Sequence, residues 1–274
     1  MMAMEARQAN FEILKGLKLA NSYKTIPNSQ DLKCVYNCFD DSACLSANFN
    51  NDKQICELNS QSPKDESSNI IEEQNWKLLY PIYESTWKLV FRATAGIGVK
   101  TYSAFTGSMS LPTPEDACKL THSLSCTTHY RDPIIDQWET QDIKQVKFEM
   151  YKDNKMVVSV IFNNTYGGNN THWFNRNQIV SSTYIDLLTE PVNYFSIEGV
   201  DYVNRRFYIN SNWGGCPVDA GWITVFDDDT LPGSTCPYEQ HLQYPYFGYS
   251  KNNLKGNWID KQSADVFCIF IKKS

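Results

Sequence analysis

The sequence predicts two folded units, a small α+β module closed by disulfides and a larger, mainly antiparallel β domain. Four cysteines lie within one short stretch, Cys34–Cys56, and from Trp87 onward short segments of alternating apolar and polar residues recur. The chain has 274 residues, of which 14% are aromatic and 20% are charged. This length and composition suit two folded domains and not a disordered chain.

The cysteine cluster predicts a helix joined twice to a hairpin. Cys34 and Cys38 are four residues apart, which places both sulfurs on one face of a helix. Cys44 and Cys56 fall in short apolar stretches that predict strands, with the turn-forming Asn50–Asp52 between them. The spacing favours disulfides over zinc, whose structural sites prefer Cys-x2-4-Cys pairs, often with histidine.

Residues 9–81 resemble a PAN/apple module. The resemblance rests on Asn10-Phe11, the helix pair Cys34 and Cys38, the strand Ala43-Cys44-x-Ser46-x-Asn48-Phe49, and Cys56-Glu57-Leu58. It implies an extracellular adhesion module with a helix on an antiparallel sheet, and nested disulfides Cys34–Cys56 and Cys38–Cys44. A further pair, common in that family and joining the two ends of the module, has no cysteines here.

Residues 86–274 predict a mainly antiparallel β domain, with a β-sandwich favoured over a barrel. One helix is expected from Thr113, because a threonine N-cap, a proline and acidic residues precede Cys118. The expected strands are Trp87–Phe91, Val146–Met150, Lys155–Phe162, Phe195–Ile197, Arg206–Asn210, Gly221–Phe226 and Ala264–Ile271.

Five cysteines fall in this second domain. Cys118 and Cys126 are close enough in sequence to form a local disulfide. Cys216 and Cys236 each precede a proline and flank one predicted strand, so a second disulfide between them could close that loop. Cys268 lies inside an apolar strand, a setting that favours a buried free thiol over an intermolecular disulfide.

Nine cysteines and two sequons predict an oxidising, extracellular compartment. The sequons place candidate glycosylation sites at Asn163 and Asn169. The first residues lack the apolar core of a signal peptide, so a trimmed N-terminus is expected. A cytosolic protein with reduced thiols is the alternative. No apolar run is long enough to predict a membrane span.

Three segments of the β domain resemble a domain of cnidarian extracellular proteins, among them uncharacterised skeletal organic matrix proteins of corals and anemones. They are Trp87–Ala93, the stretch from Ile209 to Trp222, and Ala264–Phe270. The resemblance implies secretion and association with an extracellular matrix. It implies no catalytic residues.

No catalytic signature is recognisable. The histidines, His122, His129, His172 and His241, form no metalloprotease or Cys-His motif. His122 and His129 flank Cys126, which could indicate a metal cluster, although two loop histidines beside a disulfide are favoured. The net charge is −6 and basic residues do not cluster, so a nucleic-acid partner is not expected.

The strongest binding signal lies between Asn210 and Trp222. Trp213, Asn212 and Asp219 stand beside glycines near Cys216, a combination typical of surfaces that stack on sugar rings and hydrogen-bond their hydroxyls. Core packing is the alternative for Trp213 and is favoured for Trp222. Asp227 and Asp229 form a weaker candidate Ca²⁺ site, with a solvated turn favoured instead.

The sequence therefore predicts a secreted, non-catalytic adhesion or recognition protein that binds an extracellular protein or glycan. A structural component of an extracellular matrix is the alternative, and a secreted hydrolase is a distant third.

Overall fold

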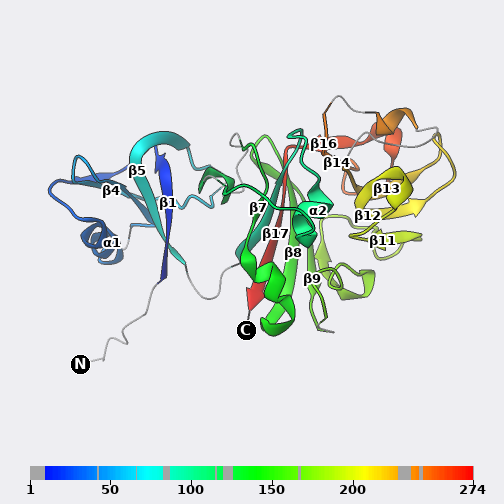
Figure 1. The fold of residues 1–274 in the computed structure, drawn as a ribbon, viewed down its shortest axis with the longest axis horizontal. Helices are drawn as coiled ribbons and strands as arrows, with labels where there is room; N and C mark the ends of the chain where they lie inside the picture. Colours follow the sequence, from blue (N-terminus) through cyan, green and yellow to red (C-terminus); the bar gives the residue numbers. More distant parts are fainter. Residues whose placement is uncertain are drawn as a thin grey trace. The chain divides into compact units, whose positions relative to one another are not determined.

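The computed structural model describes residues 10–41, 43–65, 67–82, 87–114, 116–119, 126–165, 168–227, 236–240 and 243–273. The chain divides into two compact units, Met1–Thr86 and Trp87–Ser274 (Figure 1). Each unit has its own hydrophobic core. No helix in the described ranges is long and apolar enough to cross a membrane.

The first unit is one helix on a five-stranded antiparallel sheet. The strand order is β1-β5-β3-β4-β2. The elements are β1 (Asn10–Leu19), β2 (Lys24–Ile26), α1 (Asp31–Phe39), β3 (Ser46–Asn50), β4 (Ile55–Asn59) and β5 (Ile70–Ile82).

Two disulfides attach α1 to the rest of this unit. One joins Cys34 to Cys56 on β4, and the other joins Cys38 to Cys44, just before β3. All four sulfur-bearing side chains are buried, and Phe49 and other apolar residues of the sheet pack against them. The inner face of the helix is thus built largely from cystine and not from large apolar side chains.

The second unit contains two antiparallel sheets with few helices. One sheet has the order β10-β9-β8-β17-β6-β7, and the other has the order β11-β12-β13-β14-β16, with β15 paired to β13. Its strands are β6 (Lys88–Thr94), β7 (Tyr130–Arg131), β8 (Ile143–Lys152), β9 (Lys155–Asn163), β10 (Ile179–Ser182), β11 (Tyr194–Ser196), β12 (Arg205–Asn212), β13 (Ala220–Phe226), β14 (Tyr246–Tyr249), β15 (Gly256–Asn257), β16 (Gln262–Ala264) and β17 (Val266–Lys273). The C-terminal β17 lies between β6 and β8 (Figure 1).

One hydrophobic cluster joins the two sheets. The ring of Phe207 on β12 lies 4.9 Å from that of Phe267 on β17, and Phe247 on β14 lies 5.0 Å from Phe267. Trp222 is fully buried in the same cluster. These contacts show that a face of each sheet is turned toward a common core.

The helices of this unit are short. They are α2 (Thr101–Thr106) and the 3-10 helices η1 (Asp116–Lys119), η2 (Pro133–Thr140), η3 (Arg176–Gln178), η4 (Asp201–Val203), η5 (Pro237–Glu239) and η6 (Trp258–Asp260). The helix expected from Thr113 was wrong in extent, because Thr113 and Pro114 are not helical and the described helix is the four-residue 3-10 helix η1. Cys118 in η1 is bonded to Cys126, as the sequence predicts.

Candidate functional site

Asp219 organises the loop between β12 and β13 from inside the protein. One carboxylate oxygen accepts hydrogen bonds from the backbone N–H groups of Gly214 (2.7 Å) and Gly215 (2.9 Å). The other accepts from the hydroxyl of Tyr238. Asp219 is buried, so it supports the loop and does not face solvent as a ligand-binding residue would.

Arg205 lies beneath this loop with only 2% of its surface exposed. Its guanidinium donates to Glu239 Oε1 at 2.8 and 2.5 Å, to the Tyr208 hydroxyl at 2.6 Å and to the Tyr238 hydroxyl at 3.0 Å. Burial lowers the pKa of Arg205, but the nearby Tyr208 and Glu239 oxygens raise it by more. The net effect is a pKa above the ordinary value of arginine. The residue therefore stays charged, and its charge is compensated inside the protein.

Trp213 lies over this buried cation. The guanidinium carbon of Arg205 is 4.5 Å from the Trp213 ring centroid, which is within cation–π range. Trp213 is half-buried, and its neighbour Asn212 is exposed. The Asn212 side-chain amide donates to Val218 O at 3.0 Å. Trp213 and Asn212 are therefore two of the accessible residues of a loop that Arg205 and Asp219 support from below.

The disulfide Cys216–Cys236 ties this loop to η5. η5 carries Tyr238 and Glu239, two of the residues that contact Arg205. The loop and its cysteines were predictable from the sequence, whereas Arg205, Tyr238 and Glu239 were not predicted. No local motif marks these three residues, since their contacts join positions more than thirty residues apart along the chain.

Asp227 caps a helix. Its two carboxylate oxygens accept from the backbone N–H groups of Thr101 (2.5 Å) and Tyr102 (2.9 Å), at the first turn of α2. Burial raises the pKa of Asp227, and these two hydrogen bonds oppose that effect. Both oxygens are thus already engaged, while Asp229 lies outside the described residues.

The structure describes two of the four histidines, His129 and His172. His129 is fully buried and not in an exposed loop: its Nδ1 accepts from Thr94 N at 3.1 Å, and its Nε2 lies 2.9 Å from Val99 O. His122 and His241 lie outside the described residues, and His172 is exposed. Within the described ranges no group of three or more His, Cys, Asp or Glu residues could hold a metal ion.

The two sequon asparagines differ in setting. Asn163 is the last residue of β9 and is half-buried, and its Oδ1 accepts from Gln145 Nε2 at 3.4 Å. Asn169 is exposed in the following turn. The remaining cysteine of the β domain, Cys268, is buried and unbonded in the centre of β17, and burial raises the pKa of its thiol.

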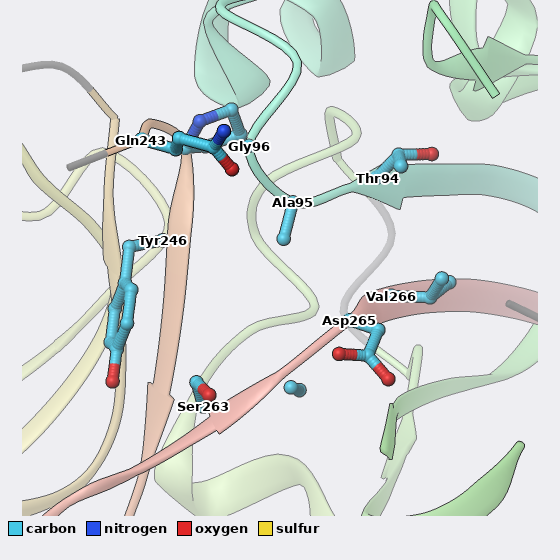
Figure 2. Close-up of a pocket in the computed structure, with 10 residues that line it drawn as sticks. Thr94, Ala95, Gly96, Gln243, Tyr246, Ser263, Asp265 and Val266 are labelled. Carbon is cyan, nitrogen blue, oxygen red and sulfur yellow. The ribbon is translucent and has the colours of Figure 1, made fainter. Parts of the chain in front are cut away.

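A pocket of about 410 Å³ opens where three segments of the β domain meet (Figure 2). Asp265 on one side accepts from Lys152 Nζ at 2.6 Å and from Asp153 N at 2.8 Å. The lining residues are Thr94, Ala95, Gly96, Gln243, Pro245, Tyr246, Ser263, Ala264, Asp265 and Val266. Hydroxyl, amide and carboxylate groups beside an aromatic ring suit a small polar ligand.

The first unit exposes an apolar stripe on α1. Leu32, Tyr36 and Phe39 are 69%, 65% and 42% exposed. Their spacing of four and then three residues places them on one face of the helix, opposite the buried Cys34 and Cys38. A helix fixed by two disulfides that turns large apolar side chains to solvent is a candidate interaction surface.

Two comparisons with known proteins bear on this geometry. Residues 9–82 match the model of the PAN domain family. No curated protein matches the chain. PAN domains are non-catalytic modules that generally bind protein or carbohydrate. The chain therefore carries a PAN domain at residues 9–82, which forms its first unit, followed by a second unit of antiparallel sheets.

Proposed function

We propose that the protein is a secreted, non-catalytic recognition protein that binds a protein or carbohydrate partner. The observation that carries the proposal is the PAN domain at residues 9–82, together with the exposed stripe Leu32, Tyr36 and Phe39 on its helix. Large exposed aromatic and aliphatic side chains on a rigid element are the usual anchors of binding surfaces.

The β domain adds a second surface in this proposal. The common core of its two sheets supports a β-sandwich. The half-buried Trp213 and exposed Asn212 lie at the β12–β13 loop, where an indole and an amide can contact a sugar ring and its hydroxyls. Because Asp219 is buried, direct contact with a ligand would fall to Trp213 and Asn212.

Secretion is supported by the disulfides. The structure contains Cys34–Cys56, Cys38–Cys44, Cys118–Cys126 and Cys216–Cys236. Four such bonds, two in each unit, are typical of proteins that fold in an oxidising compartment. The same cross-links also suit a second candidate function, a structural component of an extracellular matrix. The resemblance of the β domain to cnidarian extracellular proteins is the observation that favours this candidate.

A binding screen tests the proposal and separates it from the structural role. Full-length, oxidised protein would be screened against glycans and matrix proteins, with Ca²⁺ and again with EDTA. We expect saturable, competable binding that EDTA does not change, because both oxygens of Asp227 accept backbone N–H groups.

Matched variants locate the surface. We expect Tyr36→Ala or Trp213→Ala to weaken binding at least about tenfold, as the loss of one buried anchor does. Met156→Ala, at an exposed residue of β9, serves as the control. If the protein binds nothing in the screen, the recognition role is overturned. If both variants bind as the parent protein does, the assignment of binding to α1 and to the β12–β13 loop is overturned.

A further inference from the structure

We propose that Asn169 carries an N-linked glycan whose first sugar residues lie in two adjoining pockets beside Trp138. The inference needs passage through the secretory pathway but not the recognition role proposed above. The occupant of the pockets would be part of this molecule and not a separate partner.

Asn169 is positioned as an acceptor. It is exposed, and its Oδ1 accepts from Thr171 N at 3.0 Å and from Thr171 Oγ1 at 2.7 Å. These two bonds fix the orientation of the side-chain amide. Among the described residues, its Nδ2, the atom that would be glycosylated, makes no hydrogen bond.

Two pockets lie next to Asn169 in the folded protein. Asn169 and Asn170 line one side of a pocket of about 300 Å³, and residues of η2, among them Gln137, Glu139 and Thr140, line the other. A second pocket, of about 590 Å³, shares Trp138, Glu139 and Thr140 with the first. Their combined volume is in the range that small ligands fill, and the walls carry carboxylate, amide and hydroxyl groups that can bond sugar hydroxyls.

Trp138 supplies the independent observation. It is only 3% exposed, it borders both pockets, and its Nε1 has no hydrogen-bond partner in the described part of the chain. Trp173, which stacks on it with ring centroids 6.4 Å apart, donates to Asn170 O at 2.6 Å. Trp222 and Trp258 likewise donate, to Asp186 and Asn210.

A buried N–H without an acceptor is costly, so the Trp138 indole favours any group that brings an oxygen to it. The carbonyl of an N-acetyl sugar or a sugar hydroxyl in the pocket would provide one. The apolar face of the same sugar would lie near the indole. The residues that line the pocket thus include both kinds of group that a pyranose ring contacts.

The covalent step balances with a diphosphate-activated oligosaccharide as donor. The bond from sugar C1 to the phosphate oxygen breaks, and the diphosphate leaves with the electron pair. A bond forms from C1 to Asn169 Nδ2, which loses one proton to solvent. Nothing is oxidised or reduced.

The test uses full-length protein secreted from eukaryotic cells. Glycopeptide mapping should find Asn169 occupied. Peptide-N-glycosidase should release this glycan at least about tenfold more slowly from the native protein than from the denatured protein. Hydrogen exchange at the backbone amides of residues 137–140 should be slower in the glycosylated protein than in Asn169→Gln.

Two controls isolate the pocket. Asn163→Gln removes the sequon whose asparagine lines neither pocket, and it should leave exchange at residues 137–140 unchanged. Gln137→Ala combined with Glu139→Ala alters two exposed wall residues, and it should keep Asn169 occupied while speeding native release at least about fivefold.

An unoccupied Asn169 would overturn the proposal. Equal release from native and denatured protein would also overturn it, because a glycan extended into solvent is equally accessible in both. Neither result would bear on the binding screen, so the failure of this inference is distinguishable from failure of the recognition role.

Discussion

Arg205 illustrates how one residue governs a loop that it does not belong to. Its guanidinium bonds Glu239 and Tyr238 on η5 and lies under the ring of Trp213, while Tyr238 in turn bonds Asp219. The candidate binding loop therefore depends on a charge located at the start of the preceding strand, and its rigidity depends on that charge remaining buried and compensated.

We expect Arg205→Met to destabilise the β domain by about 3–5 kcal/mol, since it leaves the buried carboxylates of Glu239 and Asp219 without their cation. Chemical denaturation measures the change. Lys144→Met, which breaks the exposed pair Lys144–Asp142, is the control and should cost no more than about 1 kcal/mol. A cost for Arg205→Met as small as that of the control would contradict this account of the network.

His129 predicts a pH dependence of stability. Burial lowers the pKa of His129 from 6.5 to about 4, with a smaller opposing effect of the bond to Val99. The unfolded chain therefore binds a proton at this residue more readily than the folded chain between these two values. Stability contributed by neutral His129 is complete above pH 6.5 and falls, by about 3 kcal/mol in total, as the pH decreases to about 4.

Denaturant unfolding at a series of pH values between 4 and 7.5 measures this slope. His129→Gln should flatten it, and His172→Gln, at an exposed histidine, should leave it as in the parent protein. Arg92 is the charged group that adds to the effect at His129. An equal slope in the parent and in His129→Gln would assign the pH dependence to other groups.

The helix α1 is the element in which covalent bonds replace apolar packing. Cys34 and Cys38 are its buried residues, and each is part of a disulfide. The outer face carries the exposed side chains of Leu32, Tyr36 and Phe39, of which Phe39 also packs against Phe11 at a ring distance of 4.7 Å. Because the two disulfides hold the inner face of α1, its outer face can carry exposed apolar side chains.

We expect the two disulfides of the first unit to contribute unequally. Cys34–Cys56 spans 22 residues and Cys38–Cys44 spans 6, so the loop-entropy model gives about 3 and about 2 kcal/mol. Paired Cys→Ala variants of each bond, compared by denaturation, measure the difference.

The single variant Cys38→Ser, which leaves Cys44 unpaired, should abolish secretion. Normal secretion and parental thermal stability of Cys38→Ser would contradict the structural role of this bond.

The elements were predictable to different degrees. Strict alternation over Val146–Met150 predicted β8, because a half-buried strand repeats every second residue. The hairpin signal Asp153-Asn154 predicted β9. β13 was also predicted, although nearly all of its residues are buried and it does not alternate. The helix α2 was missed. Its N-terminal N–H groups are capped by Asp227, 126 residues away from Thr101, so no signal for the helix start exists in the local sequence.

At the scale of the whole molecule, the two units rely on different sources of stability. The first unit has a small core built around cystine, whereas the second has a continuous aromatic core shared by two sheets. Small domains need cross-links because they bury too little apolar surface.

We expect calorimetry of the full chain to show that a reductant lowers the unfolding temperature of the first unit more than that of the second. Hydrogen exchange at the amides of α1 and of β17 assigns each transition to its unit. Equal shifts would show that the core of the second unit depends as strongly on Cys118–Cys126 and Cys216–Cys236.

The sequence by itself determined the features that depend on the spacing of residues close together in the chain. The short motifs between Asn10 and Leu58, with their cysteine spacing, were enough to predict the PAN module, and the resemblance implied the disulfide partners that the structure contains. Only the tertiary structure decided the surroundings of the candidate sites. Asp219 and Asp227 read as surface carboxylates, yet both are buried, because Tyr238 and Thr101 reach them from distant segments that packing brings together. Long-range packing leaves no period in the chain, so the partners of a buried charge can be found only once the fold is known.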